Sequence, residues 1–328
     1  MNLMKIEDST TPNPLIASCL ATKDLKGNNY NTFSKYYKSK YGFRVFKIGL
    51  STGIECPKRV AGDECNFCVR ETFIDNNLTE NAIPTIPAQI EYMISKMKNK
   101  VKAGGYIAYF QDGTSFYGNM EYLYNLFKEA DEHPEILELI ISTRPEYVTE
   151  EFLNMLNRLK KPVTIEVGVQ SANDKSLAFL NRGHTQADNQ RAIDILSRYN
   201  FRVGVHIILG IAAPLSLQPC RGVAKNELHP PSYRDEALNT AKWINANKVI
   251  NDVKIHHLAV FKGSKLEKMK YRGISLSEYI PILAYFISVL RKDLTISRLF
   301  TSNLNRHQTM LNDFPGVKRM WLNEFEKY

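Results

Sequence analysis

Apolar runs and amphipathic stretches alternate along the middle of the chain. The apolar runs have the length of strands, and the stretches between them carry apolar residues at steps of three and four, which is typical of helices. One face of residues 87–104, for example, collects four apolar side chains: Ile90, Ile94, Met97 and Val101. Strands are expected at 44–50, 106–111, 136–142, 163–170, 202–209 and 253–260. Helices are expected at 87–104, 119–130, 149–160, 186–199, 233–246 and 277–291, with a short one from Asn173.

Six strand–helix repeats in a row predict an α/β fold, in which helices cover a parallel sheet. The sheet is either open and doubly wound or barrel-like, and in both cases ligands bind at the C-terminal ends of the strands. Residues 43–299 are expected to form this core, with an insert at 212–231. A polar, irregular N-terminal extension (residues 1–42) and a C-terminal extension (residues 300–328) are expected to flank it.

The composition excludes some classes of protein. The 328 residues are 44% hydrophobic and 23% charged, without a low-complexity tract, which is ordinary for a folded globular chain. No apolar run reaches the roughly 18–20 residues of a membrane span, so we expect a soluble, cytoplasmic protein with no membrane partner. The net charge of +9 fits either a polyanionic partner such as RNA or a solvated basic surface, and the scattered lysines do not separate the two.

Three of the five cysteines lie in the segment "GIECPKRVAGDECNFC", which follows the first expected strand. An odd, clustered set of cysteines argues against a secreted disulfide framework and favours a metal or cluster site. A closed zinc site would need a fourth ligand besides Cys56, Cys65 and Cys68, such as the distant Cys19 or Cys220. A redox Cys-x-x-Cys pair would not need Cys56. Three thiolates suit a [4Fe–4S] cluster in which one iron keeps an open position.

The cysteine loop resembles the radical S-adenosylmethionine (SAM) superfamily, with a wider spacing of its three-cysteine motif. Wider spacings also occur in the catalytic subunit of the elongator complex. Five further segments extend the resemblance to the YhcC-like group of that superfamily, over residues 28–299. They are "YFQDGTSFYG" (109–118), "STRPEYV" (142–148), "IEVGVQSANDKSLAFLNRGH" (165–184), "VHIILG" (205–210) and "VKIHHLAVFKGSKL" (253–266).

The resemblance implies a partial (βα)6 TIM-like barrel and two cofactors, a [4Fe–4S] cluster and SAM. In the superfamily, the cluster cleaves SAM to a 5′-deoxyadenosyl radical that abstracts hydrogen from a substrate, with electrons from a reductant such as flavodoxin or ferredoxin. The elongator subunit acts on tRNA, so an RNA or nucleotide-linked substrate is the favoured expectation here. Two rival hypotheses are a zinc-stabilised RNA-binding module without enzymatic activity and a degenerate SAM-binding Fe–S protein.

The resemblance also assigns side chains to the cofactors. Cys56, Cys65 and Cys68 would bind the cluster, and Phe67 would pack near the adenine of SAM. Gln111 or Thr114, in the turn after the second predicted strand, would accept the SAM amino group. The competing interpretation of that turn is a plain strand-to-helix connection.

The following strands supply the remaining candidates, and for the polar ones the alternative interpretation is a structural role. Ser142 and Thr143 would point to the rim. Gln170 would hold the ribose of SAM, Arg182 would pair with its carboxylate and His206 would add a polar ribose contact. Ile211 would offer backbone groups to the adenine.

Some residues carry weaker expectations. Glu166 should face the same side of its strand as Gln170 and, if it points inward, needs a partner. His256 and His257 should face opposite sides of the last predicted strand. The turn "GIAAPLSLQPCRG" departs from the Gly-Leu-Pro-Gly-Glu of relatives, and Cys220 within it is read as an isolated thiol. The basic segment "KGSKLEKMKYR" either grips phosphates or forms a solvated helix surface.

Overall fold

The computed structural model describes residues 30–69, 85–98, 103–111, 113–211 and 233–301. The predicted insert at 212–231, nearly all of the C-terminal extension, Cys19 and Cys220 lie outside these residues.

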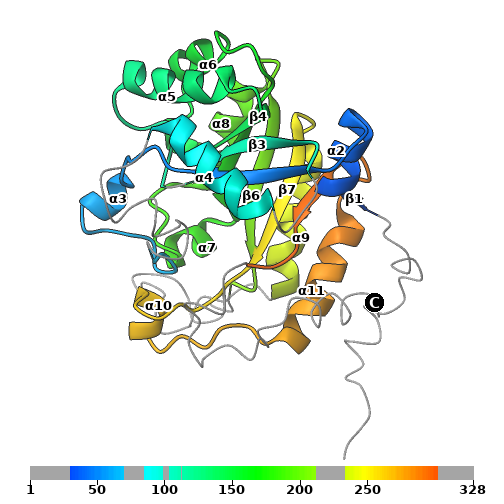
Figure 1. The fold of residues 1–328 in the computed structure, drawn as a ribbon. Helices are drawn as coiled ribbons and strands as arrows, with labels where there is room; N and C mark the ends of the chain where they lie inside the picture. Colours follow the sequence, from blue (N-terminus) through cyan, green and yellow to red (C-terminus); the bar gives the residue numbers. More distant parts are fainter. Residues whose placement is uncertain (1–29, 70–84, 99–102, 112, 212–232, 302–328) are drawn as a thin grey trace, which may run out of the picture.

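A single parallel sheet of eight strands forms the centre of the described structure. Its order is β1-β8-β7-β6-β5-β4-β3-β2, and the sheet curls into a partial TIM-like barrel (Figure 1). The strands are β1 (Asn31–Thr32), β2 (Val45–Leu50), β3 (Gly105–Phe110), β4 (Ile136–Thr143), β5 (Val163–Gln170), β6 (Arg202–Leu209), β7 (Ile250–His257) and β8 (Thr295–Arg298). The predicted α/β fold with a partial barrel is confirmed, and the open doubly wound alternative is not what forms.

Helices cover the convex side of the sheet: α4 packs on β2, α5 on β4, and α9 and α11 on β6 (Figure 1). The longer helices are α4 (Ile86–Lys98), α5 (Met120–Glu132), α8 (Gln186–Leu196), α9 (Tyr233–Ala246) and α11 (Leu276–Val289). The shorter ones are α2 (Phe33–Tyr41), α3 (Pro57–Val60), η3 (Pro145–Tyr147), α6 (Glu150–Leu156), α7 (Asp174–Phe179) and α10 (Lys265–Lys268). None of the helices in the described part of the chain is long and apolar enough to cross a membrane.

The predicted strands at 163–170 and 202–209 and the predicted helix at 233–246 agree with the observed bounds. The last predicted strand was placed three residues too late, because β7 begins at Ile250 and its polar start, Asn251 and Asp252, does not look like an apolar run. The strands β1 and β8 were not predicted.

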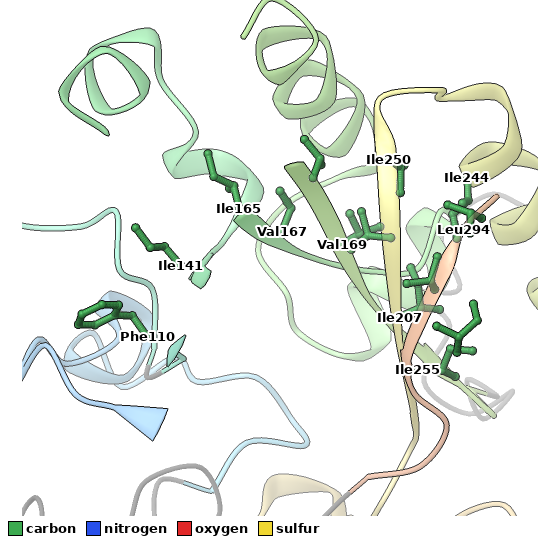
Figure 2. Packing of buried hydrophobic residues seen from close by; sticks show 14 of the residues in the cluster. Phe110, Ile141, Ile165, Val167, Val169, Ile207, Ile244, Ile250, Ile255 and Leu294 are labelled. Carbon is green, nitrogen blue, oxygen red and sulfur yellow. The ribbon is translucent and has the colours of Figure 1, made fainter. Parts of the chain in front are cut away.

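The two faces of the sheet differ in chemistry. Along β5, the side chains of Ile165, Val167 and Val169 point toward the helices and are fully buried in the main core (Figure 2). The alternate positions, which include Glu166 and Gln170, lie on the opposite, concave face because successive side chains of a strand point to opposite sides. The apolar face stabilises the fold, and the concave face is free to carry polar chemistry.

The expectation that residues 1–42 are irregular is wrong for α2, which closes the N-terminal end of the barrel. The Thr32 hydroxyl accepts a hydrogen bond from the Lys35 amide at 3.2 Å at the helix start, and Gly42 ends the helix with φ of 79°. Tyr37 is buried, and its hydroxyl donates to Glu138 at 3.4 Å. The helix "FSKYYKSKY" escaped prediction because its buried face consists of tyrosines rather than of aliphatic residues at helical spacing.

Candidate active site

The three clustered cysteines line one cavity at the C-terminal ends of the strands. Five of the SAM-contact candidates line the same cavity: Phe67, Gln111, Gln170, Arg182 and His206. The other residues that line it, which the sequence analysis did not assign to the cofactors, include Arg59, Tyr109, Arg144, Lys254, His256, His257 and Arg298. The structure therefore brings together segments from β2 to β8 that lie far apart in the sequence.

The cysteine loop is held in place from both sides. Asn66 donates its backbone N–H to the carbonyl of Leu180 at 3.0 Å, at the end of α7, and accepts from the N–H of Leu266 at 2.9 Å. On the other side, a Cβ added to Gly113 would lie 3.1 Å from the backbone nitrogen of Cys56, and Gly113 has φ of 60°. A glycine is needed there, because the turn after β3 approaches the cysteine loop so closely. Cys56, Cys65 and Cys68 form no disulfide bonds.

Three arginines point their guanidinium groups at two of the sulfur atoms. Arg182 and Arg144 approach Cys65 Sγ at 3.4 and 3.7 Å, and Arg59 approaches Cys68 Sγ at 3.1 Å. Burial alone would raise the pKa of the Cys65 thiol, but Arg182 and Arg144 outweigh it and lower that pKa below its usual value. Burial raises the pKa of Cys68 to about 11, and Arg59 offsets only part of that rise.

Arg182 is buried, and its guanidinium contacts the end of β5. It donates to the carbonyl of Gly168 at 2.9 Å, and a Cβ at Gly168 would lie 3.1 Å from its Nη2. Its Nε is buried without a hydrogen-bond partner among the described residues. Gln170, two residues after Gly168, adopts the left-handed region with φ of 67°, which turns the chain sharply at the end of β5. A cradle with one unsatisfied donor therefore lies beside Cys65.

Four candidates do not line the cavity. The hydroxyls of Thr114 and Thr143 hydrogen-bond each other at 3.0 Å, and Thr114 also accepts from the N–H of Arg144 at 3.2 Å. Ser142 lies one layer deeper and donates to the hydroxyl of Tyr109 at 3.4 Å. Ile211 is buried in a small apolar cluster, against which Phe67 packs. Their assigned contacts with SAM stay predictions.

A charged network occupies the barrel below the cysteines, and Glu166 is at its centre. Lys47 donates to Glu166 Oε1 at 2.9 Å, and His206 and Lys254 approach Oε2 at 2.6 and 3.4 Å. Lys254 also donates to the hydroxyl of Tyr109. The expectation that an inward Glu166 needs a partner agrees with these contacts. The signal that could have revealed Lys47 and Lys254 is a lysine in the middle of a buried strand, which is stable only when paired.

Protonation in this network follows from burial and charge. Burial alone would raise the pKa of Glu166, but Lys254, Lys47 and His206 together lower it well below its usual value, so the carboxylate is ionised. Burial lowers the pKa of His206 to about 4, and Lys254 adds to that effect, so its ring is neutral at pH 7. The Nε2 atom of His206 forms a hydrogen bond with Glu166 Oε2.

His256 and His257 do not behave as a simple inward–outward pair. Both line the cavity, and His257 also packs edge-on against the ring of Tyr279 in α11, with centroids 5.6 Å apart. Burial lowers the pKa of His257 to about 3. Its backbone carbonyl accepts from the Thr301 hydroxyl at 2.8 Å, so this residue connects the end of β7 to the segment after β8. His256 is the one of the two whose ring lies near His206, at 5.8 Å between centroids.

Comparison with known proteins places this arrangement in a family. Residues 51–212 match the family model described as "Radical SAM superfamily". The chain is 30% identical over 282 residues to the uncharacterized protein MJ0486 of Methanocaldococcus jannaschii, which covers 84% of this chain and 81% of that protein. It is 28% identical over 259 residues to protein YhcC of Escherichia coli K12, covering 76% of each. The resemblance to the YhcC-like group is thereby confirmed.

A solved structure shares the fold. The archaeal Elp3 of Methanocaldococcus infernus with an N-terminus deletion superposes with a TM-score of 0.61 at 17% sequence identity. The match covers 86% of this chain but 63% of that one, so this chain spans less than two thirds of the length of its structural neighbour.

Proposed function

Because this chain belongs to the radical SAM superfamily, we propose that it is an enzyme whose Cys56, Cys65 and Cys68 hold the cluster and whose barrel binds SAM and a substrate. The cofactors of this family are a [4Fe–4S] cluster and SAM, and together they supply a 5′-deoxyadenosyl radical that abstracts hydrogen. The observation that carries the proposal is the meeting, in one cavity, of three free thiols with the guanidinium groups of Arg59, Arg144 and Arg182.

The donor set fits a [4Fe–4S] cluster. Three thiolates leave one iron open, and the arginines beside Cys65 and Cys68 offset the negative charge of the thiolates. Among the described residues, no three His, Cys, Asp or Glu side chains converge on a single metal-ion position. A cluster does not require such convergence, because each of its cysteines binds a different iron.

The cavity beside the cysteines fits the polar groups of SAM. The unsatisfied, buried Nε of Arg182 calls for an acceptor, and a carboxylate is the acceptor that a guanidinium binds best. Gln111 and Gln170 would supply neutral hydrogen bonds to the amino group and ribose, and Phe67 an apolar surface for the adenine. Ile211 would contribute its backbone groups. His206 would orient the ribose from its bond with Glu166.

Thr114, Ser142 and Thr143 would act from behind the cavity wall. The contact of Thr114 with the N–H of Arg144 fixes the start of η3, and with it the guanidinium that reaches Cys65. These hydroxyls would therefore position a cavity residue, and any direct contact with SAM would require their present hydrogen bonds to break.

The finer elements of the function are proposals as well. An RNA or nucleotide-linked substrate is supported by the net charge of +9 and by the resemblance to the elongator subunit. Electrons would come from a reductant such as flavodoxin or ferredoxin, and the enzyme would work in the cytoplasm. Filter retention of tRNA at about 50 and 200 mM salt tests the RNA element, since binding through phosphates falls steeply with salt. An absence of retention at the lower salt would contradict it.

The enzyme proposal is tested by anaerobic reconstitution with iron and sulfide, followed by incubation with SAM and dithionite. We expect a broad absorbance near about 400 nm, which is general for Fe–S clusters, and 5′-deoxyadenosine detected by chromatography. A zinc-stabilised module would give neither signal. A cluster that forms without releasing 5′-deoxyadenosine would indicate a degenerate member and overturn the proposal.

Single alanine substitutions separate the three ligands from the other cysteines. Cys56→Ala, Cys65→Ala and Cys68→Ala should each abolish 5′-deoxyadenosine formation and weaken the cluster absorbance. Cys19→Ala and Cys220→Ala are the matched controls and should retain both signals. Circular dichroism should show the wild-type helical content in Cys56→Ala, Cys65→Ala and Cys68→Ala, because none of these three cysteines forms a disulfide. Turnover by a variant of the first group would disprove the ligand assignment.

A further inference from the structure

Arg298 is a cation in the barrel that the network around Glu166 does not use. It ends β8 and stands opposite Lys254 of β7 in the parallel register. Its side chain lines the cavity of the three cysteines and also a second hollow that opens between β2 and β8. Tyr109 and Lys254 line both hollows too, so Arg298 stands where they meet.

Arg298 makes no hydrogen bond or ion pair with any residue that the structure describes. The other two barrel cations differ, because Lys47 and Lys254 both bind Glu166. Both oxygens of Glu166 are already occupied, Oε1 by Lys47 and Oε2 by His206 and Lys254. The barrel thus gives Glu166 two lysine partners, whereas Arg298 has no counter-charge among the described residues.

An unpaired guanidinium in a partly enclosed cavity is costly unless an anion pairs with it. The planar guanidinium donors of Arg298 suit the two oxygens of a carboxylate or phosphate. Lys254 lies next to it on the neighbouring strand; burial lowers the pKa of its amine well below the usual value, and its Nζ would donate a further hydrogen bond to the same anion. The Nζ of Lys254 lies over the ring of Tyr109, 4.4 Å from its centroid, and this ring lines the same two hollows as Arg298.

The depth of this position separates it from the SAM groups assigned above. Lys254 precedes His256 by two residues on β7, so it lies about 6–7 Å deeper along the strand than the rim. Arg182, the candidate for the SAM carboxylate, lies on the rim beside Cys65. Arg182 and Arg298 therefore lie at different depths of one cavity.

We propose that Arg298 and Lys254 form an anion-binding subsite on the floor of the cavity, which takes a carboxylate or phosphate group of the substrate. The anion would anchor the substrate from below and leave its remaining part facing the cysteines. The assignment of the ligand as substrate rests on the proposed function. The existence of the anion subsite does not depend on turnover.

Protection of arginines from phenylglyoxal tests the subsite in the full-length chain. Modification of each arginine is followed by peptide mass spectrometry on the reconstituted protein, with and without SAM, while inorganic phosphate or malonate is titrated. We expect a saturable slowing of modification at Arg298 and an unchanged rate at the exposed Arg272. Protection by phosphate alone would identify a phosphorylated substrate, and protection by malonate alone a carboxylic acid.

Three outcomes would overturn the proposal. The first is no slowing at Arg298, and the second is equal slowing at Arg272. The third is full protection by SAM alone with no further effect of either anion, which would assign Arg298 to the carboxylate of the cofactor. Formation of 5′-deoxyadenosine by the wild-type protein is measured separately, so a failure of the proposed function is distinguishable from a failure of the subsite.

Equilibrium dialysis with the labelled anion provides the matched variant test. Arg298→Gln should weaken binding by roughly tenfold or more, the effect of losing a charge-assisted hydrogen-bond donor. Arg272→Gln removes the same formal charge from the exposed surface and should bind as the wild type does. Equal affinities for Arg298→Gln and Arg272→Gln would show that the anion responds to net charge only.

Discussion

The two ends of the barrel use charged residues in opposite ways. At the N-terminal end, Arg202 donates to both oxygens of Asp252 at 2.6 and 2.9 Å, and the ring of Tyr36 covers its guanidinium at 3.8 Å. At the C-terminal end, Arg182 keeps an unsatisfied Nε and Arg298 has no counter-charge among the described residues. One sheet therefore carries a closed end with matched charges and an open end with surplus cations.

The difference distinguishes polar groups that stabilise the fold from those that are available to ligands. Glu138 is surrounded by Tyr37, Lys40 and Tyr41, all from α2, and so ties the helix to the barrel. The open end instead contains the cavity that the three cysteines line. The surplus donors there are compatible with folding only because the cavity gives them water or a ligand.

The largest expected effect comes from breaking the matched end. Asp252→Ala leaves the partly buried Arg202 without its carboxylate, so the free energy of unfolding should fall by ~3 kcal/mol. Arg298→Ala removes a cation that has no partner and should change the same quantity by less than ~1 kcal/mol. Urea denaturation of both variants measures the contrast. Equal losses of stability would show that the two ends do not differ as described.

Near the open end lies a buried carboxyl group that has no cationic partner in the part of the chain that the structure describes. Glu236 of α9 accepts a hydrogen bond from Ser171 at 2.6 Å, and its Oε2 has no partner among the described residues. Burial raises its pKa from 4.5 to about 7, because no nearby cation stabilises the charged form. Between these pH values the folded state binds the additional proton, so this residue contributes stability in acid that is lost as the pH rises toward 7.

The variant Glu236→Gln cannot ionise and therefore removes this pH dependence. Relative to the wild type, it should gain stability from near zero at about pH 4 to roughly 3 kcal/mol at pH 8. The measurement is the difference in urea unfolding free energy between the two proteins at each pH. Buried histidines such as His257 titrate in both proteins and cancel in that difference. A difference that stays flat with pH would disprove the assignment.

The smallest expected effect concerns a hydroxyl behind the cavity wall. Thr114→Val leaves the buried N–H of Arg144 without its acceptor and should cost ~1–2 kcal/mol of stability. Thr114→Ser keeps the hydroxyl and serves as the control. If Thr114 acts only by position, SAM affinity, measured by equilibrium dialysis, should fall less than about tenfold in the valine variant. A larger loss with unchanged stability would indicate direct contact with SAM.

The sequence predicted the central strands well because their signal is local. Strands β4, β5 and β6 are runs of apolar residues between helices, and both faces of each run are buried. Strand β1 has two residues and strand β8 has four, and both are too short for any periodicity to appear. Their place in the sheet is determined by partners distant in the chain, which no local pattern reveals.

The candidate site shows the same limit. Cysteine spacing and family motifs were enough to identify the cavity wall, including Gln170 and Arg182. They could not show that Thr114 turns its hydroxyl toward Thr143, because that depends on how β3 and β4 pack. Arg298 was missed for a related reason, since it ends a strand that was itself not predicted.

The pairing of β1 with β8 determines when the N-terminal segment can dock during folding. Asn31 bonds the carbonyl of Lys292, 261 residues later, and β1 pairs with β8. The first described segment to leave the ribosome must therefore wait for the last strand before it can dock, and contacts of such long range form late. Until then, the closed end exposes Glu138, Arg202 and Asp252 to water. Charged side chains tolerate that delay, whereas an apolar end would expose the nascent barrel to aggregation.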